Sequence, residues 1–325
     1  MAIAELITLV VSVAILAKAS ETVVDNASKL ARFFGISQLA IGMLLIAVST
    51  SLPELSVSIA SSTASQGAIA AGNVFGSNIA NILLILGIGA VAYGFKVKKD
   101  VLADLALALM LTTVISAYII YHSSILGSAL GFAEGALLLL IGAWYAKRML
   151  GKKKISEDRS GHEIGKREAL THFLFFFAGI IVVIISSQFV VDSAVGLATA
   201  AGLSKSFIGA TLIAVGTSLP ELSIDLQAIR KRQYGLALGD AIGSNMANLT
   251  LVLGAAAAIN PIVVQLSIFM AALLFAVVAN MIFLYIAVVK KEFGRREGIA
   301  MLALYALYLI VIFYLQFGEM GIRIA

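Results

Sequence analysis

Cysteine is absent from this chain of 325 residues, and proline, histidine and charged residues are scarce. Without cysteine, neither disulfides nor thiolate metal sites can form. The three histidines fall near the ends of apolar runs or in a polar linker, which does not suit a soft-metal centre. Charged residues make up 13% of the chain and hydrophobic residues 61%, a composition that excludes an ordinary soluble domain.

Long apolar runs take the place of the missing polar residues. Examples are Val101–Tyr121, Phe132–Tyr145 and Leu266–Val289. Each run can cross a hydrocarbon core as a helix, and we count about ten such spans. The N-terminus has no basic segment or cleavage site of a signal peptide, so we expect the first span to be retained. The sequence predicts an all-α polytopic membrane protein.

The basic residues indicate how these spans are oriented. If the connections after spans 1, 3, 5, 7 and 9 share one side, that side holds all 23 Lys and Arg residues except Lys205 and Arg323. By the positive-inside rule, these connections are cytoplasmic and both termini are extracellular. This placement in loops also argues against nucleic acid as the partner of a chain with net charge +5.

The two halves of the chain repeat each other. Ser20–Gly87 aligns without a gap on Ser187–Gly254, an offset of 187 − 20 = 167 positions. With five spans per half, the second half enters the membrane from the opposite side, and such inverted repeats hold their substrate near the bilayer midplane. We predict a first repeat at 1–150, a cytoplasmic linker at 151–168 and a second repeat at 169–325.

Two of the three prolines lie in the first repeated motif, Thr-Ser-Leu-Pro-Glu, at 50–54 and 217–221. Proline lacks an N–H and opens the helical turn before it, and irregular backbone inside a membrane normally lines a cavity. A carboxylate in hydrocarbon costs about 2.5–3.5 kcal/mol and usually has a cationic partner. The motif therefore predicts a cation site at Glu54 and Glu221, with hydroxyls three and four residues earlier on the same helical face.

The second repeated motif is Gly-Ser-Asn-x-x-Asn, at 76–81 and 243–248. Its Ser and second Asn are four residues apart, so each copy presents a hydroxyl and an amide oxygen on one face. Asn78 and Asn245 lie one residue off that face, and we expect them to form structural hydrogen bonds. The combined set is all oxygen, which suits Ca²⁺ with its six to eight oxygen ligands better than Zn²⁺ or Cu⁺.

The charge of the two glutamates suggests a mechanism. Two ionised glutamates carry −2, which one Ca²⁺ or two Na⁺ would neutralise. An empty site would leave both charges bare in a low dielectric, so we expect the protein to change state only when loaded and to exchange one ion for the other. Exchange of three Na⁺ for one Ca²⁺ would move one net charge, worth about 2.3 kcal/mol per 100 mV.

Both motif pairs resemble the α-repeats of the sodium/calcium exchangers in the cation/Ca²⁺ antiporter superfamily. The resemblance implies a ten-helix fold in which spans 2, 3, 7 and 8 form the ion-binding core and spans 1 and 6 slide across it. It implies transport of Ca²⁺ and Na⁺ by a monomer in the lipid bilayer, with no cofactor and no enzymatic activity. Carried over by position, the metal ligands are Ala47, Thr50, Ser51, Glu54, Ser77, Asn81, Ala214, Thr217, Ser218, Glu221, Ser244 and Asn248.

Some alternatives stay open. A proton-coupled or K⁺-assisted antiporter would have the same fold, but proton-coupled relatives typically show Gly-Asn-x-x-Glu where this chain has Ser-Leu-Pro-Glu. A passive channel would not require a site that is assembled from both halves of the chain behind broken helices. An intramembrane aspartyl protease using Asp225 and Asp240 would leave the repeated glutamates unexplained.

Asp225 and Asp240 also break the repeat, because they replace Ser58 and Asn73. They would extend an ion path, accept a proton or lie near the aqueous end. Since Asp225 is close to the basic cluster Arg230–Arg232, we expect a structural role for it.

Overall fold

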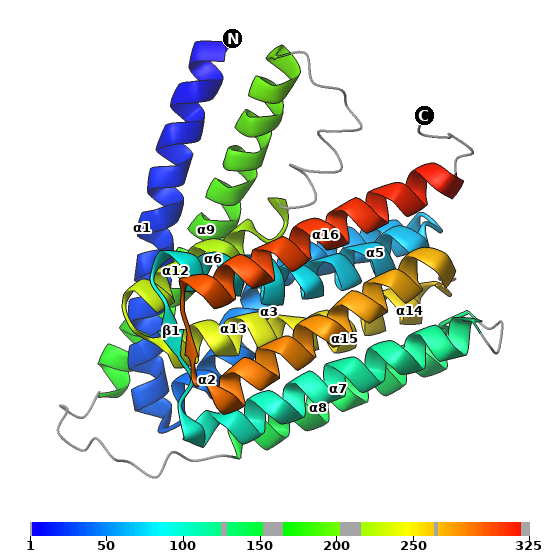
Figure 1. The fold of residues 1–325 in the computed structure, drawn as a ribbon. Helices are drawn as coiled ribbons and strands as arrows, with labels where there is room; N and C mark the ends of the chain where they lie inside the picture. The colour runs from blue at the N-terminus through cyan, green and yellow to red at the C-terminus, as the bar shows by residue number, and fades with distance from the viewer. Residues whose placement is uncertain (1, 125–128, 152–164, 202–215, 263–265, 320–325) are drawn as a thin grey trace. The chain divides into compact units, whose positions relative to one another are not determined.

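The computed structural model describes residues 2–124, 129–151, 165–201, 216–262 and 266–319, and within them the chain is almost wholly helical (Figure 1). Two short strands, β1 (Phe95–Lys96) and β2 (Glu292–Phe293), pair in antiparallel fashion. The rings of Phe95 and Phe293 stack with their centroids 4.6 Å apart. Because these strands are only two residues long and the other elements are helices, the predicted all-α class is confirmed for this part of the chain.

The helices of the first half are α1 (Ala2–Phe34), α2 (Gln38–Ile41), η1 (Gly42–Ile46), α3 (Ala47–Thr50), α4 (Leu52–Thr63), α5 (Gly67–Ile79), η2 (Ala80–Ile85), α6 (Leu86–Ala92), α7 (Lys99–Ser124) and α8 (Phe132–Leu150). Those of the second half are α9 (Lys166–Ala200), α12 (Leu219–Arg230), α13 (Tyr234–Ala247), η4 (Asn248–Val252), α14 (Leu253–Ile259), α15 (Leu266–Val289) and α16 (Arg295–Glu319). The segments named η are π-helical turns that continue directly from the α-helices around them.

Seven of the described helical stretches are long and apolar enough to cross a membrane, at Ile3–Phe34, Gly67–Ala92, Lys99–Ile119, Lys166–Ala200, Tyr234–Ile259, Phe269–Val289 and Arg295–Leu315. An eighth candidate is the bent pair Gln38–Thr50 and Leu52–Thr63. Residues 202–215, which belong to one of the predicted spans, lie outside the described residues. The chain is thus a multi-pass membrane protein, and the predicted number of ten spans remains a prediction.

Large apolar side chains cover the outside of these helices. Met110, Met281 and Tyr314 have exposed fractions of 62%, 67% and 67%. Contiguous exposed apolar surface is rare on a soluble monomer and marks contact with a partner or a membrane. Together with the lengths of the helices, it indicates that these side chains face lipid.

One compact unit, Met1–Pro53 with Arg148–Asp240, is built around α1 and α9, which lie side by side (Figure 1). Their contact is close because a Cβ added at Gly179 would lie only 2.9 Å from Val23 Cγ2. Polar pairs lie in the same interface, where His172 Nδ1 is 2.8 Å from Asn26 Oδ1. Small residues and buried polar pairs are the usual means of helix packing in a membrane.

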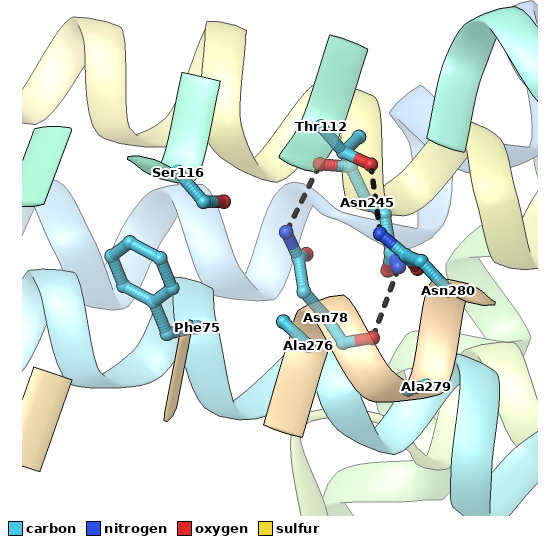
Figure 2. Close-up of a pocket in the computed structure, with 8 residues that line it drawn as sticks. All are labelled: Phe75, Asn78, Thr112, Ser116, Asn245, Ala276, Ala279 and Asn280. Atoms are coloured by element: carbon cyan, nitrogen blue, oxygen red, sulfur yellow. Dashed lines mark hydrogen bonds between the residues drawn. The ribbon is translucent and has the colours of Figure 1, made fainter. Parts of the chain in front are cut away.

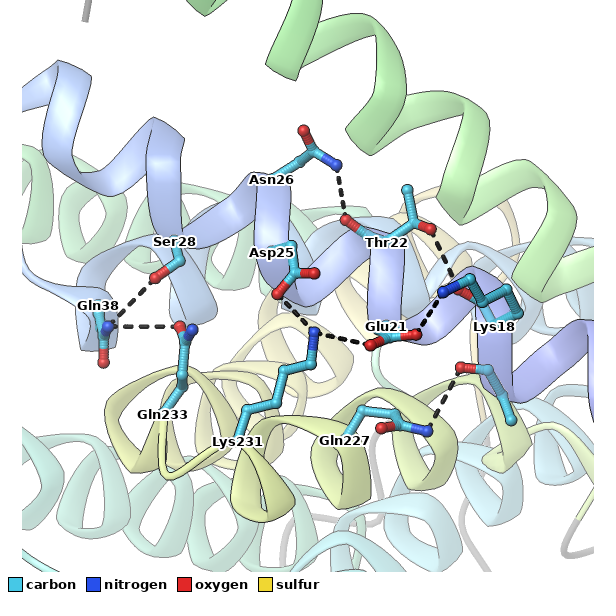
Figure 3. A network of polar contacts seen from close by, with 11 residues as sticks. Lys18, Glu21, Thr22, Asp25, Asn26, Ser28, Gln38, Gln227, Lys231 and Gln233 are labelled. Carbon is cyan, nitrogen blue, oxygen red and sulfur yellow. Dashed lines mark hydrogen bonds and ion pairs between the residues drawn. The ribbon is translucent and has the colours of Figure 1, made fainter.

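A network of charged side chains joins α1 to the C-terminal end of α12 in the same unit (Figure 3). Lys231 Nζ lies 2.6 Å from Asp25 Oδ1 and 3.1 Å from Glu21 Oε1, and Glu21 also contacts Lys18 at 2.7 Å. Burial lowers the pKa of Lys231, but its hydrogen bonds to Asp25 and Glu21 outweigh that effect and raise the pKa above its usual value. Lys231 therefore stays charged and holds the two helices together.

The other compact unit, Glu54–Lys147 with Ala241–Ala325, packs several helices through glycine. A Cβ added at Gly135 of α8 would lie 2.6 Å from the Gly254 carbonyl oxygen at the start of α14. A polar contact joins α7 and α15, where Asn280 Nδ2 donates to Thr113 Oγ1 at 2.8 Å. Close backbone packing and a buried amide thus hold the helices of this unit together.

Gly239 of α13 lies directly against the backbone of η1 within the first of these units. A Cβ added there would lie 2.9 Å from Gly42 Cα and 3.0 Å from the Met43 nitrogen. Gly72 of α5 stands at the matching position of the repeat, yet a Cβ added to Gly72 would have no heavy atom within 4 Å. The two glycines are equivalent in sequence and differ in packing.

Substituting Gly239→Ala should destabilise the protein by about 1–3 kcal/mol, because the crowding atoms belong to the backbone and cannot move aside. The matched control Gly72→Ala should leave the Tm unchanged or slightly raised, since alanine favours a helix over glycine. Thermal unfolding of both purified variants in detergent measures the difference. Equal Tm values for the two variants would contradict the close packing of α13 on η1.

Candidate functional site

The two proline motifs form two helix starts. The first lies at Ser51, where α3 and α4 meet at an angle of 46°. Pro53 is the second residue of α4, and Pro220 takes the same place in α12. At these positions the missing N–H of proline has no helical partner to lose. Each proline therefore lies directly after the first residue of a helix, and the glutamate lies in the first turn of that helix.

Both glutamates are deeply buried. Glu54 and Glu221 each have an exposed fraction of 1%. Each lies in the first turn of its helix, α4 or α12, where the helix dipole favours a negative charge. Since the first turn has backbone N–H groups without helical partners, its start is a suitable place for a carboxylate.

Thr50 and Ser51 show how the hydroxyls of the first motif are placed. Thr50 Oγ1 lies 3.3 Å from the Ala47 carbonyl oxygen and 3.2 Å from Asp240 Oδ1. The Ala47 carbonyl also accepts the Ser51 N–H at 3.0 Å. Ser51 Oγ, in contrast, is buried without a hydrogen-bond partner among the described residues.

Four residues of the predicted ligand set share this property of a buried oxygen with no partner. Within the described part of the chain, no hydrogen-bond partner reaches Ser51 Oγ, Ser218 Oγ, Asn81 Oδ1 or Asn248 Oδ1. The four residues have exposed fractions of 2% or less. An unmet buried acceptor costs about 1–3 kcal/mol, and a protein rarely keeps several. These oxygens are therefore suited to a positively charged ligand.

The free oxygens of Asn81 and Asn248 result from a network of four amides within the second unit. Asn81 Nδ2 donates to Asn245 Oδ1 at 3.0 Å, and Asn248 Nδ2 donates to Asn78 Oδ1 at 3.1 Å. Asn78 and Asn245 each donate to the other's carbonyl oxygen, at 3.2 and 3.0 Å. Every amide nitrogen is thus used inside the network, which turns the oxygens of Asn81 and Asn248 away from protein donors.

This network confirms the structural hydrogen bonds predicted for Asn78 and Asn245. Figure 2 shows both residues beside Asn280 and Thr112 on the wall of a small cavity. Its volume of about 10 Å³ is that of roughly one water-sized probe. The cavity can hold a water molecule but has no room for an organic ligand.

The π-helical turns coincide with the same asparagines. Asn81 lies in η2 and Asn248 begins η4. Single π turns inside α-helices are rare and frequently occur at functional sites. Sequence reasoning missed these turns, because the residues of both segments are ordinary helix formers.

The remaining predicted residues are placed as follows. Ser77 and Ser244 are buried in α5 and α13, Thr217 is half-buried before α12, and Ala214 lies outside the described residues. Ala47, Thr50, Ser51, Thr217, Ser218 and Glu221 belong to the first compact unit, and Glu54, Ser77, Asn81, Ser244 and Asn248 to the second. Among the described residues, no three His, Cys, Asp or Glu side chains form a group able to hold a metal ion. A cation here would therefore need the neutral oxygens as well as the carboxylates.

Of the three possibilities left open for Asp225 and Asp240, a place near the aqueous end does not fit, because both aspartates have an exposed fraction of 0%. The structural role expected for Asp225 stays a prediction. The nearby basic residues do not neutralise Asp225, since neither of its carboxylate oxygens has a hydrogen-bond partner in the described part of the chain.

Comparison with known proteins gives consistent matches. The family model described as sodium/calcium exchanger protein matches residues 4–146 and 171–314. Inner membrane protein YrbG of Escherichia coli is 35% identical, covering 78% of this chain and 79% of its own length. The sodium/calcium exchanger MaX1 of Methanosarcina acetivorans is 28% identical, covering 94% of this chain and 98% of its own length. A structure of the sodium-calcium exchanger NCX_Mj soaked with Na⁺ is 27% identical, with a TM-score of 0.82 over 95% of this chain and 99% of that one.

The amide network predicts a specific pattern of coupling between mutations. Asn78→Ala and Asn248→Ala remove two side chains that bond each other, so their effects on the free energy of unfolding should fall short of additivity by about 0.5–3 kcal/mol. Asn78→Ala and Asn26→Ala serve as the control, because Asn26 bonds Thr22 and His172 and shares no hydrogen-bond partner with Asn78, and they should add within about 0.5 kcal/mol. Thermal unfolding with a chelator present measures both cycles. Additivity in the Asn78–Asn248 cycle would contradict the network.

Proposed function

Because the chain belongs to the sodium/calcium exchanger family, we propose that it is an antiporter that exchanges Ca²⁺ for Na⁺ by alternating access. Its homologues are transporters, so the expectation that it is not an enzyme is confirmed. The transported ions of the exchangers it matches are Na⁺ and Ca²⁺. We extend this proposal to the ligands and to the coupling ion.

The observation that carries the proposal is the set of buried oxygens that have no hydrogen-bond partner in the described part of the chain. Four of these oxygens, on Ser51, Ser218, Asn81 and Asn248, belong to residues of the two repeated motifs, whereas Ser187 Oγ and the oxygens of Asp225 lie outside them. Hydroxyl and amide oxygens beside carboxylates are ligands of hard cations, and Ca²⁺ tolerates an irregular shell of six to eight of them. The amide oxygens of Asn81 and Asn248 are acceptors only and therefore repel an anion.

We assign the ligands as the sequence predicts. They are the carbonyls of Ala47 and Ala214, the side chains Thr50, Ser51, Ser77, Thr217, Ser218 and Ser244, the amides of Asn81 and Asn248, and the carboxylates Glu54 and Glu221. The two glutamates supply the charge. One Ca²⁺ or two Na⁺ neutralise them, and the cost of two bare carboxylates in a low dielectric prevents the empty protein from changing state.

We further propose that ten spans form two inverted repeats, at 1–150 and 169–325, joined by a cytoplasmic linker at 151–168. Both termini would be extracellular, and the protein would function as a monomer. Contacts between residues 167 positions apart support the repeat, since Asn78 and Asn245 exchange hydrogen bonds and Asn280 donates to Thr113. Contacts between equivalent positions of the two halves are expected near a two-fold axis that relates them.

The nearest alternative is a proton-coupled or K⁺-assisted antiporter of the same fold. Relatives matched over part of the chain include the sodium/potassium/calcium exchanger 1 of Gallus gallus, 28% identical over 42% of this chain. The Thr-Ser-Leu-Pro-Glu motif favours sodium as the driving ion.

Glu54→Gln or Glu221→Gln should each reduce Ca²⁺ uptake into proteoliposomes by at least about 100-fold. Either change leaves a bound Ca²⁺ with one uncompensated charge, and breaking a buried charge pair costs about 3–5 kcal/mol. Glu134→Gln is the matched control, since Glu134 accepts the Gly131 N–H at 2.9 Å outside both motifs and should leave uptake near normal. Near-normal uptake by both motif variants, with intact folding, would refute the ligand assignment.

Ca²⁺ uptake into proteoliposomes loaded with Na⁺ tests the coupling ion. An outward Na⁺ gradient should drive uptake at constant pH and without K⁺, and a pH gradient alone should not. If three Na⁺ exchange for one Ca²⁺, a membrane potential that favours the moving charge should accelerate uptake. Uptake driven by the pH gradient alone would establish the proton-coupled alternative.

A further inference from the structure

Two short loops are joined by backbone pairing in the second compact unit. β1 lies between α6 and α7, and β2 lies between α15 and α16 (Figure 1). The strands pair Phe95 with Phe293, and the Val97 N–H donates to the Lys291 carbonyl oxygen at 2.9 Å. The ring of Phe293 also stacks on Phe283 of α15, with the centroids 4.8 Å apart. Both loops are therefore fixed to each other and to the helices beside them.

These loops lie at the ends of four candidate membrane spans. Gly67–Ala92 and Phe269–Val289 end just before them, and Lys99–Ile119 and Arg295–Leu315 begin just after them. Lipid headgroups lie at the level where apolar spans end and water begins. The paired loops are thus placed at the surface of the membrane.

The charges of the two loops are strongly unequal. Residues 95–100 and 290–297 contain seven basic and three acidic side chains. Lys96 contacts Glu292, and Lys290 Nζ lies 2.6 Å from Glu297 Oε1. Among the described residues, no acidic side chain forms an ion pair with the other five bases, which are Lys98, Lys99, Lys291, Arg295 and Arg296. We refer to these five as the basic patch.

Contacts within the protein do not favour these charges. Lys99 begins α7, and Arg295 and Arg296 begin α16. The start of a helix carries partial positive charge, so basic residues are more favourable at the other end. Lys291 is half-buried, and the other four bases are exposed. The patch is therefore suited to negative charge that comes from outside the protein.

We propose that the basic patch binds the phosphate of an anionic phospholipid headgroup. Arg can hold a phosphate through two parallel N–H···O bonds, and Lys contacts it as a point charge. Each basic residue beside an anionic membrane surface strengthens the interaction about fivefold. Because β1 and β2 fix the spacing of the two loops, the bases are brought together before the lipid binds.

The surface beside the patch favours a lipid over a free phosphate ion. Tyr93, Val288 and Ile299 have exposed fractions of 54%, 49% and 52%. Acyl chains can pack on such side chains while the headgroup contacts the bases, whose aliphatic stems also lie well along apolar surface. A free phosphate ion would make no use of this apolar surface.

This inference goes beyond the proposed exchange, because it concerns a lipid at the membrane surface and does not depend on which ions cross. It also goes beyond the orientation of the spans. The positive-inside rule accounts for basic residues in loops. It does not require two loops to gather their bases into one fixed patch.

Thermal unfolding of the full chain in detergent tests the patch. Phosphatidylglycerol and phosphatidylcholine with the same acyl chains are added in separate series at constant ionic composition. A ligand that binds only the folded state raises the Tm as its concentration passes the Kd. We expect the Tm of the wild type to rise at a lower concentration of phosphatidylglycerol than of phosphatidylcholine.

Lys98→Gln with Arg295→Gln removes one exposed charge from each loop. This variant should need at least about tenfold more phosphatidylglycerol for half of the rise in Tm. Lys147→Gln with Arg148→Gln is the matched control, since it removes two exposed bases of α8 and should respond as the wild type does. If the patch variant does not fold, Lys98→Gln alone is measured in the same way and should need about fivefold more lipid.

Three results would overturn the proposal. The first is an equal response of the wild type to both lipids. The second is the same weakening in the patch variant and in the α8 control, since the net charge of the protein would then attract the lipid. The third is the full rise in Tm with inorganic phosphate in place of lipid, because the ligand would then be a free anion.

Discussion

The two repeated motifs contain buried oxygen atoms that no protein donor in the described residues reaches, and this is the main physical constraint on their structure. Leaving one such acceptor unmet costs about 1–3 kcal/mol, and the described residues contain several on the two repeated motifs. A soluble protein would admit water to such atoms. In the function that we propose, cations that bind and leave satisfy these oxygens.

In the second motif, the two asparagines of each copy have different roles. Asn78 and Asn245 use both their amide nitrogens and their amide oxygens inside the network, and so fix the orientation of Asn81 and Asn248. Because all four amide nitrogens donate within the network, the amide atoms left without a partner among the described residues are the oxygens of Asn81 and Asn248. In the site that we propose, ligand and support are therefore separate side chains, and a support residue would alter binding without touching an ion.

Much of this arrangement follows from the sequence. The apolar runs predict the membrane helices, and the Gly-Ser-Asn-x-x-Asn spacing separates Asn78 from the Ser77–Asn81 face. The prolines predict an opened turn within a helix at each motif, whereas in the structure a new helix begins there with proline as its second residue. These features depend on helical periodicity and on the missing N–H of proline, which are local properties of the chain.

Other features depend on packing neighbours that cannot be identified from the sequence. Asp225 is close in sequence to Arg230, but five residues turn a helix by about 140° beyond one full turn, so Arg230 is exposed and Asp225 is buried. The repeat likewise predicts equal surroundings for Gly72 and Gly239, and only Gly239 is crowded. An internal repeat specifies matching backbones and does not specify which segments pack against them.

The wide turns η2 and η4 have a mechanical consequence. A π turn holds one residue more than an α turn, so tightening it to α geometry would pass that surplus residue along the helix. The segment beyond would then advance by about 1.5 Å and rotate by about 100° without any loss of helical continuity. Since Asn81 and Asn248 lie within these turns, such a slip would swing their oxygens inward or outward. Each of these two turns thus combines a surplus residue with an asparagine that we propose as an ion ligand.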